Sequence, residues 1–274
     1  MNGEGDPGTV AGSTVGGACA RVLLTADPRA KLMAARAVAR AWRMGRLASD
    51  FAAPMPDRPA RPPRPELLPP NRMPRRGRMG SQRSRVAMLH ALAHIEFVAI
   101  DLAFDLIGRF GEGFPAAFVD DWMRVGAEEA MHFALLDRRL RQLGSHYGAL
   151  PAHDGLWQSA EDTAGDCLAR LAVVPMVLEA RALDITPATV ARFEEAGDAV
   201  SARMLRRIMA DEIRHVAAGT RWFTYKMNGT GHSAPEQYQI LVKRHFRGVI
   251  KPPFNDSARR QAGLTRDYYD ALAT

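Results

Sequence analysis

The stretch Asp211-Glu212-Ile-Arg214-His215 decides how the rest of the chain is interpreted. It lies in a long helical pattern whose apolar residues recur every three to four positions, and Glu212 and His215 both fall on that apolar face. An i, i+3 offset places a carboxylate and an imidazole one turn apart on the same side of a helix. One such motif is a weak signal, because glutamate is common in helices.

A second copy of the motif, Glu129-Ala-Met-His132, lies on another apolar helical face. Two more helical patterns each carry a single inward-facing acid, Glu96 and Glu179. Glu96 precedes Glu129 by 33 positions, and Glu179 precedes Glu212 by 33 positions. The repeat predicts two helical hairpins that bring matched groups to one centre.

Charge explains why these acids would lie together. A carboxylate on the inward face of a helix bundle costs several kcal/mol unless it is paired or coordinates a cation. Arg181 and Arg214 are too few to pair with four buried glutamates. Two divalent cations would balance four carboxylates, so we predict a two-metal site. Its predicted ligands are Glu96, Glu129, His132, Glu179, Glu212 and His215.

The fold class expected from these patterns is all-α. Four long helices are predicted at about 82–108, 115–143, 158–184 and 198–227, which form a four-helix bundle over residues 81–228. Thr186-Pro187 is expected to end the third helix, and a short extra helix is expected over 187–196. A tail at 229–274 holds two weaker helical patterns, at about 234–247 and 256–272.

Residues 1–80 differ from the remainder in composition and charge. Residues 1–18 are interpreted as a disordered leader, and 27–48 as an amphipathic helix. Residues 54–80 contain nine of the 18 prolines and seven arginines, which predicts an extended arm. That arm could be a solvated linker, a nucleic-acid contact or a strap along the bundle. Its hydrophobic residues Leu67, Leu68 and Met73 favour the strap.

Bulk composition narrows the protein class. The chain has 274 residues, 47% of them hydrophobic and 24% charged, which is typical of a soluble globular protein. The net charge of +7 comes from residues 1–80. No apolar run is as long as a membrane span, and no signal peptide is recognised. Only Cys19 and Cys167 are present, so no disulfide framework is expected and the reducing cytoplasm is the expected location.

The motif set resembles the ferritin-like di-iron carboxylate superfamily, in which two helices supply one Glu each and two supply Glu-x-x-His. Residues 211–215 also resemble the Asp-Glu-x-Arg-His form of di-iron hydroxylases and desaturases. The resemblance implies that Asp211 and Glu128 accept hydrogen bonds from the histidine of the opposite helix, with Arg214 beside them. Met131 replaces the arginine of that form on the second helix.

A more local similarity covers about residues 85–223, including Leu-Pro-Ala-His at 150–153 and Val-Pro-Met-Val-Leu-Glu-Ala-Arg at 174–181. These segments are similar to an uncharacterised bacterial ferritin-like family that has no agreed activity. This similarity implies a fold and a site, and it does not imply a substrate.

The expected cofactor is a pair of metal ions, iron first, with manganese or a mixed Mn/Fe pair as alternatives. The leading functional hypothesis is an O2-dependent oxidase or hydroxylase of a small organic molecule, served by an electron-donor protein. Iron handling, peroxide detoxification and RNA modification are the alternatives, and a homodimer is compatible with each. The candidate pocket residues are Phe133, Met176, Met209 and Phe223.

Three histidines and one proline carry smaller expectations. His90 and His94 point away from the face of Glu96, so contacts to the Pro/Arg arm are favoured over metal binding. His153 is interpreted as a loop hydrogen-bonding residue. Pro175 lies four residues before Glu179 and predicts a kink or a π-bulge beside the site.

Overall fold

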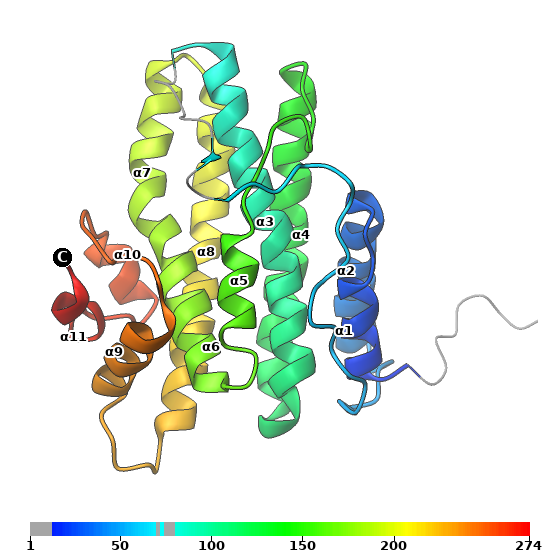
Figure 1. Cartoon of the computed structure of the whole chain (residues 1–274), viewed down its shortest axis with the longest axis vertical. Coiled ribbons are helices and arrows are strands. Elements are labelled where there is room, and N and C mark those ends of the chain that lie inside the picture. The colour runs from blue at the N-terminus through cyan, green and yellow to red at the C-terminus, as the bar shows by residue number, and fades with distance from the viewer. Residues whose placement is uncertain (1–12, 70–71, 74–79) are drawn as a thin grey trace, which may run out of the picture.

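The computed structural model in Figure 1 describes residues 13–69, 72–73 and 80–274. Within these ranges the regular structure is helical, and β-structure is limited to isolated bridges such as the one between Leu67 and Ala152. The all-α expectation is therefore confirmed for the described residues.

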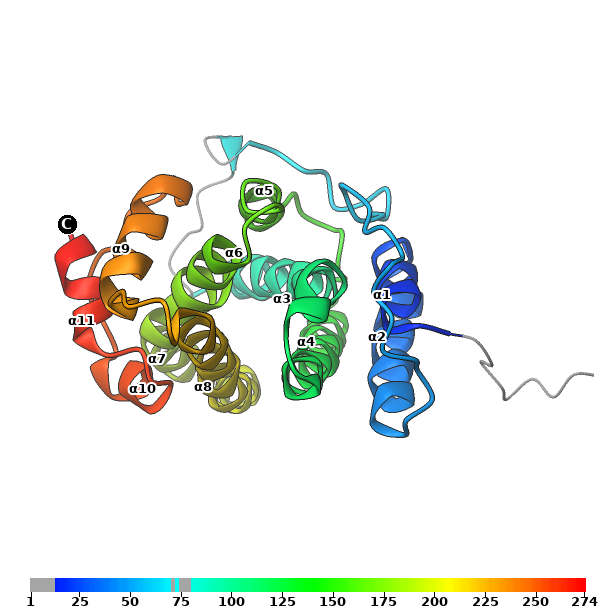
Figure 2. The same ribbon diagram turned by 90° about the horizontal axis from the view of Figure 1, so that it is seen from below.

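Three long helices form the centre of the molecule: α3 (Gln82–Phe110), α4 (Ala116–Gln142) and α8 (Ala199–Met227). Their bounds agree with the predicted ranges to within two residues. Ser81 caps α3 by accepting from the backbone N–H of Ser84, and Asp198 caps α8 in the same way through Ser201. Figures 1 and 2 show these helices side by side with a fourth, composite rod.

The composite rod replaces the third predicted helix and differs from it at both ends. It contains α6 (Cys167–Val173), a π-helical segment (Val174–Glu179) and α7 (Ala180–Glu195). The preceding short helix α5 (Gly155–Glu161) is separate. The predicted start at 158 is wrong because Asp166, just after Gly165, caps a new helix by accepting from the backbone N–H of Ala169.

The prediction that Thr186-Pro187 ends the third helix is also wrong. Helix α7 continues through Pro187 to Glu195, so the expected extra helix at 187–196 is the second half of α7. A proline inside a helix releases the carbonyl four residues earlier, here that of Leu183. Asn255 donates to that carbonyl through its side-chain nitrogen at 3.1 Å. A tail residue thus supplies the hydrogen bond that Pro187 cannot.

Pro175 produces the π-helical segment, which was one of the two distortions predicted for it. Gly219 on α8 lies directly against this proline. A Cβ atom added at Gly219 would lie 2.5 Å from the Pro175 Cβ atom. The close approach of α8 to the π-helical segment therefore depends on the missing side chain of Gly219.

Gly219→Ala should destabilise the protein, although alanine is the better helix former. The rigid Pro175 ring cannot move aside as a flexible side chain would, so we expect a loss of about 1–3 kcal/mol from overpacking. Denaturant unfolding measures the change. Gly165→Ala is the matched control, because a Cβ atom there has nothing within 4 Å. Equal midpoints for the two variants would contradict the packing argument.

The N-terminal region adds two helices, α1 (Val15–Leu23) and α2 (Pro28–Arg43), against α3 and α4 (Figure 2). The interpretation of residues 1–18 as disordered is wrong from Val15 onward, and residues 1–12 lie outside the described part. Gly16 and Gly17 made a helix unexpected here, because glycine is a poor helix former. In the fold Gly16 permits close packing, since its Cβ would lie 3.1 Å from the Phe51 Cα atom.

Residues 54–69 of the Pro/Arg-rich arm lie along the helices as a strap, and 70–71 and 74–79 are outside the described part. The backbone N–H of Ala60 donates to Leu23, and that of Leu68 donates to Ala152. Arg61 and Lys31 both pair with Asp101 on α3, where Lys31 and Asp101 are fully buried. The strap is thus attached by main-chain hydrogen bonds and by a buried ion cluster.

The tail forms a small layer against α7 and α8 (Figure 1). It contains α9 (Ala234–His245), α10 (Asp256–Gln261), α11 (Arg266–Tyr269) and a final 3-10 turn (Asp270–Leu272). The predicted second tail helix is therefore divided. Arg259 makes a buried two-point ion pair with Asp184 of α7, which attaches the layer to the bundle.

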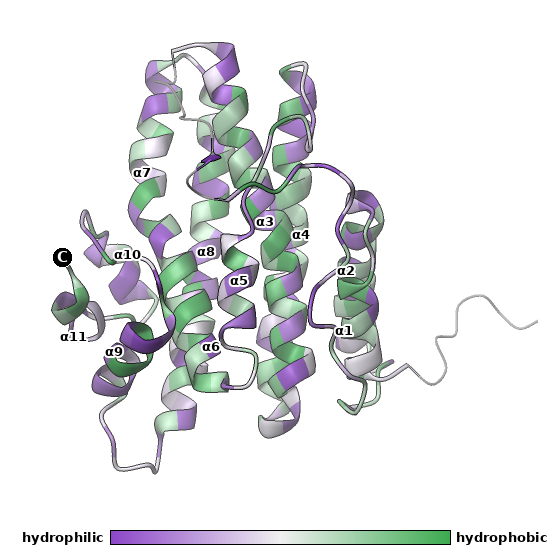
Figure 3. Cartoon of the chain, in the orientation of Figure 1, coloured by the Kyte–Doolittle hydropathy of each residue, from purple (hydrophilic) through white to green (hydrophobic). Residues whose placement is uncertain are grey.

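Helix α3 is both long and apolar. By length and hydropathy the segment Gln82–Gly113 could cross a membrane, but 67% of its most apolar window is buried inside the protein. Figure 3 shows hydrophobic and hydrophilic residues on the same helices, as expected where one face of each helix is buried. The apolar residues of α3 pack against α1 and α4.

Candidate metal centre

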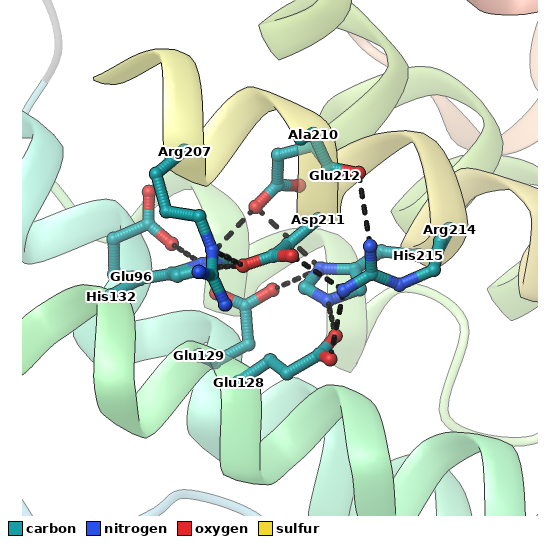
Figure 4. Close-up of polar contacts among 10 residues, drawn as sticks. All are labelled: Glu96, Glu128, Glu129, His132, Arg207, Ala210, Asp211, Glu212, Arg214 and His215. Atoms are coloured by element: carbon teal, nitrogen blue, oxygen red, sulfur yellow. Dashed lines mark hydrogen bonds and ion pairs between the residues drawn. The ribbon is translucent and has the colours of Figure 1, made fainter. Parts of the chain in front are cut away.

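The central helices bring the predicted ligands to one buried region. Four of the residues offer ligand atoms that all lie within 4.8 Å of one another: Glu96, Glu129, His132 and Glu212. They come from α3, α4 and α8 (Figure 4). His215, one turn after Glu212, lies against the same carboxylates.

His132 faces three carboxylates with the Nδ1 atom of its ring. The Nδ1 atom is 3.3 Å from Glu96 Oε2 and 3.5 Å from Glu129 Oε2. It is also 3.4 Å from Glu212 Oε1. The side chain of His132 is fully buried.

His215 presents the same atom to the other side of the cluster. Its Nδ1 is 2.9 Å from Glu129 Oε1 and 3.5 Å from Glu212 Oε1. The two imidazole centroids are 5.7 Å apart. Glu129 and Glu212 each contact both histidines. Of the two histidines, Glu96 contacts only His132.

The outer nitrogens of both rings are held by acids of the opposite helix. The Nε2 of His132 on α4 is 3.1 Å from Asp211 Oδ2 on α8. The Nε2 of His215 on α8 is 2.9 Å from Glu128 Oε2 on α4. Arg214 donates to both Glu128 and Asp211, as Figure 4 shows. These contacts are the ones that the family resemblance implied.

This crossed arrangement determines which ring nitrogen is free to coordinate. An Nε2–H that donates to a carboxylate leaves the lone pair on Nδ1, and Nδ1 faces the cluster in both rings. In its neutral form each imidazole would then present an inward lone pair, as a metal ligand requires. The histidines could therefore serve as ligands without rotating.

Several buried polar atoms at the centre lack hydrogen-bond partners among the described residues. They are Glu129 Oε2, His132 Nδ1, Glu179 Oε2, Glu212 Oε1 and His215 Nδ1. Native proteins satisfy nearly all buried polar atoms, and the usual exceptions mark a bound ion, water or a functional site. Five such atoms at one place fit a site that holds cations.

Glu179 approaches the centre from the end of the π-helical segment. It lies outside the group of four, but its carboxyl is close enough to interact with Glu129, Glu212 and His215. Burial, and then the charges of Glu129 and Glu212, raise the pKa of Glu179 to about 8. Burial and the neighbouring Glu129 also raise the pKa of Glu96 well above its usual range.

The histidines show the opposite electrostatic balance. Burial lowers the pKa of His132, but the three carboxylates that face its Nδ1 atom, those of Glu129, Glu212 and Glu96, outweigh burial and raise the pKa strongly. The pKa of His215 is raised in the same way, against burial, by Glu212 and Glu129. Burial would raise the pKa of Glu129, yet His215 and His132 hold it below its usual range. Without metal, protons supply part of the positive charge at this centre.

Metal binding should therefore release protons. The raised pKa values favour the protonated forms of both imidazoles, Glu96 and Glu179, and a coordinated ligand must lose its proton. We expect roughly two or more protons released per chain, and weaker metal binding as pH falls. Calorimetry in two buffers of different ionisation enthalpy counts the protons. Metal affinity that stayed constant from pH 8 to pH 6 would contradict this prediction.

Two of the four candidate pocket residues line separate cavities. Phe133 lines a cavity of about 500 Å³ between α2 and α4, and Met176 lines one of about 100 Å³ against the tail. Phe223 is fully buried against Tyr238, and Met209 is half-buried. Their joint lining of one substrate pocket stays a prediction.

His90 and His94 have a structural role that the sequence did not indicate. Instead of the arm, they bind the connection between α4 and α5. His94 is 2.9 Å from the Tyr147 hydroxyl, and His90 Nε2 accepts from the backbone N–H of Gly148. His153 Nδ1 accepts from the backbone N–H of Gly155, which agrees with its interpretation as a loop residue.

Comparison with known proteins identifies the relatives of the chain. Residues 24–270 match the model of a family described as "Protein of unknown function (DUF455)". The chain belongs to this family. The chain is also similar to an uncharacterized protein of Haemophilus influenzae, to which it is 39% identical over 215 residues. The alignment covers 76% of this chain and 74% of that protein. No solved structure matches the chain.

Membership in the DUF455 family does not indicate an activity, so the chemistry of the candidate metal centre is the available guide to function. The matched range 24–270 covers α2, the strap, the central helices and most of the tail. It therefore includes all six candidate ligands and the acids behind the histidines.

Proposed function

We propose that this DUF455 protein is a di-iron carboxylate protein with a ferritin-like four-helix bundle, and that it catalyses O2-dependent oxidation or hydroxylation of a small organic molecule. The observation that carries the proposal is the set of five buried atoms without hydrogen-bond partners at the centre. They belong to carboxyls and imidazoles, and each could coordinate a cation once it has lost its proton.

The contacts suggest how the six residues would share two ions. Glu129 and Glu212 lie between the histidines and would help to hold both ions. Glu96 and His132 would complete one ion, and Glu179 and His215 the other. Four carboxylates and two imidazoles suit iron or manganese, so a di-iron pair is proposed, with Mn or mixed Mn/Fe as alternatives.

When bound, a pair of ferrous ions would pass electrons to O2, and the donor protein or the substrate would replace those electrons. In a hydroxylation, one oxygen atom enters a substrate C–H bond and the other leaves as water, with two electrons from a donor protein and two protons from solvent. In an oxidation, the substrate supplies the two electrons and two protons, and O2 leaves as hydrogen peroxide. The proposed partners are accordingly a small-molecule substrate, O2 and, for hydroxylation, an electron-donor protein.

The chain's own residues would hold the metal ligands in position and enclose the centre. Asp211 and Glu128 hold each imidazole in one orientation, and Arg214 fixes both acids by donating to each. The candidate ligands Glu96, Glu129, His132, Glu212 and His215 are themselves buried, which limits the access of water to the centre. Orientation of ligands by such partners is commonly worth 10- to 100-fold in metal affinity.

Iron handling or peroxide detoxification would use the same residues and remains the alternative. RNA modification gains less support, because two arginines of the strap are engaged internally. Arg58 pairs with Asp154 and Glu161, and Arg61 pairs with Asp101.

Anaerobic loading with Fe(II), followed by rapid mixing with O2, tests the proposal. We expect saturation at about two irons per chain and a transient absorbance that requires O2. A loaded protein that is inert to O2 would exclude an oxidase. Much faster reaction with hydrogen peroxide than with O2 would favour detoxification, and a large multi-subunit shell in a size measurement would favour storage.

A further inference from the structure

A groove of about 720 Å³ lies between α2 and α4, at the edge of α8. It is formed by residues from helices that are far apart in sequence, and it exists only because α2 packs against α4. Its volume is within the range of small-molecule binding sites.

The groove has a strongly positive rim. Five arginines line it: Arg36, Arg43, Arg124, Arg138 and Arg207. The first four make no ion pair or hydrogen bond with any residue in the described part of the chain. Other arginines, such as Arg170 and Arg259, are paired with buried aspartates. Unpaired guanidinium groups around one hollow are suited to carboxylate or phosphate groups.

The acids of the groove do not neutralise this rim. Asp120 accepts from the indole N–H of Trp42 at 2.7 Å. Glu128 is engaged by His215 and Arg214. Both carboxylates therefore already have partners, and neither contacts the four free arginines.

The floor of the groove is largely apolar. Met123 is buried, and Trp42, Met131 and Leu135 are half-buried. Methionine and tryptophan side chains provide adaptable contact area for hydrocarbon. Inorganic phosphate alone would leave this floor uncovered, whereas an anion with an apolar body would contact the floor and the rim together.

Two residues connect the groove to the candidate metal centre. Glu128 lines the groove and holds His215. Arg207 also lines it and is 3.3 Å from Asp211, which holds His132 (Figure 4). A ligand that pairs with Arg207 would compete with Asp211 for the guanidinium group. It would therefore alter the partner of one histidine without touching a ligand atom.

We propose that the groove between α2 and α4 binds a small organic anion with an apolar body, and that its occupation modulates the centre. The binding claim stands on the groove alone, and the modulation claim rests on the proposed function. Helix α4 separates the groove from the inward ligand atoms, so the anion acts as an effector and is not itself oxidised.

Decanoate is a suitable probe, and decan-1-ol is its uncharged match. Calorimetry on the full, metal-free chain should show decanoate binding at least about tenfold more tightly than decanol or inorganic phosphate. Arg43→Gln with Arg124→Gln should weaken decanoate binding about tenfold or more, because both side chains are exposed and unpaired. Arg206→Gln is the matched control, since this exposed arginine pairs with Glu194 outside the groove.

Decanoate binding that is unchanged in the double variant, or equalled by decanol, would overturn the binding claim. Tighter binding of a single-stranded RNA oligonucleotide than of decanoate at physiological salt would also overturn it. Modulation is tested separately with Co(II)-loaded protein, whose visible spectrum should shift when decanoate is added. Failure of metal loading would count against the proposed function and leave the metal-free binding result intact.

Discussion

Glu129→Ala should abolish two-metal binding while the protein remains folded. Glu129 is the residue closest to both histidines, with Oε1 2.9 Å from His215 Nδ1 and Oε2 3.5 Å from His132 Nδ1. Its loss would remove a ligand from each proposed ion at once. We expect anaerobic Fe(II) titration to saturate at about one iron per chain or fewer, compared with about two for the unmodified protein.

Two controls make this result interpretable. Circular dichroism should show unchanged helix content, because the variant removes a buried charge and leaves the helix faces intact. Glu195→Ala changes an exposed glutamate at the end of α7 and should keep full metal content. Retention of two irons by Glu129→Ala would exclude the proposed centre, and His215→Ala offers an independent repeat from the other helix.

Asp101→Ala should cause a large loss of stability at a position away from the metal centre. Asp101 is fully buried and is the shared partner of Lys31 from α2 and Arg61 from the strap. Removal of one member of a buried ion pair leaves its partner charged and desolvated, which costs about 3–5 kcal/mol. The free energy of unfolding in denaturant measures the loss, and proteolysis within residues 54–69 should accelerate.

A double variant separates the effect of an unpaired buried charge on stability from the effect of altered packing. Lys31→Met with Asp101→Leu removes both buried charges, while Arg61 is partly exposed and can turn toward water. This variant should be markedly more stable than Asp101→Ala. Glu194→Ala breaks an exposed pair with Arg206 and should cost less than about 1 kcal/mol. Similar losses for Asp101→Ala and Glu194→Ala would contradict the importance of the buried cluster.

The placement of the candidate ligands on the helix faces could be predicted from the sequence, because it depends on local helix geometry. The i, i+3 spacing of Glu129 with His132, and of Glu212 with His215, places each pair on one helix face whatever the tertiary context. Pro175 was equally informative, since a missing backbone N–H must distort a helix locally. The ends of α3, α4 and α8 followed from their long apolar stripes and clear breaks.

The errors arose where a distant residue compensates for a local signal. Pro187 is tolerated in α7 because Asn255, from the tail, donates to the Leu183 carbonyl. Gly16 is helical because Phe51 packs against it. The predicted start of the third helix at 158 is wrong for a local reason. Asp166 caps a new helix there, and a capping aspartate can be recognised in the sequence.

The groove could not be predicted from any one segment. Arg43 and Arg124 are separated by 80 residues and share a surface only because α2 packs against α4. In the sequence both look like ordinary solvated arginines of helix surfaces. The tertiary arrangement places them beside the acids that support the histidines.

The crossed pairing of His132 with Asp211, and of His215 with Glu128, has a consequence for assembly of the fold. Neither the α3–α4 pair nor the composite rod with α8 holds a histidine together with its orienting acid. The acid that orients each imidazole belongs to the other half of the chain. Formation of the centre therefore reports that both halves have docked in the correct register. The two ions would act as a reversible cross-link between the halves, and a chain cleaved in the 144–157 connection should need both fragments to bind iron.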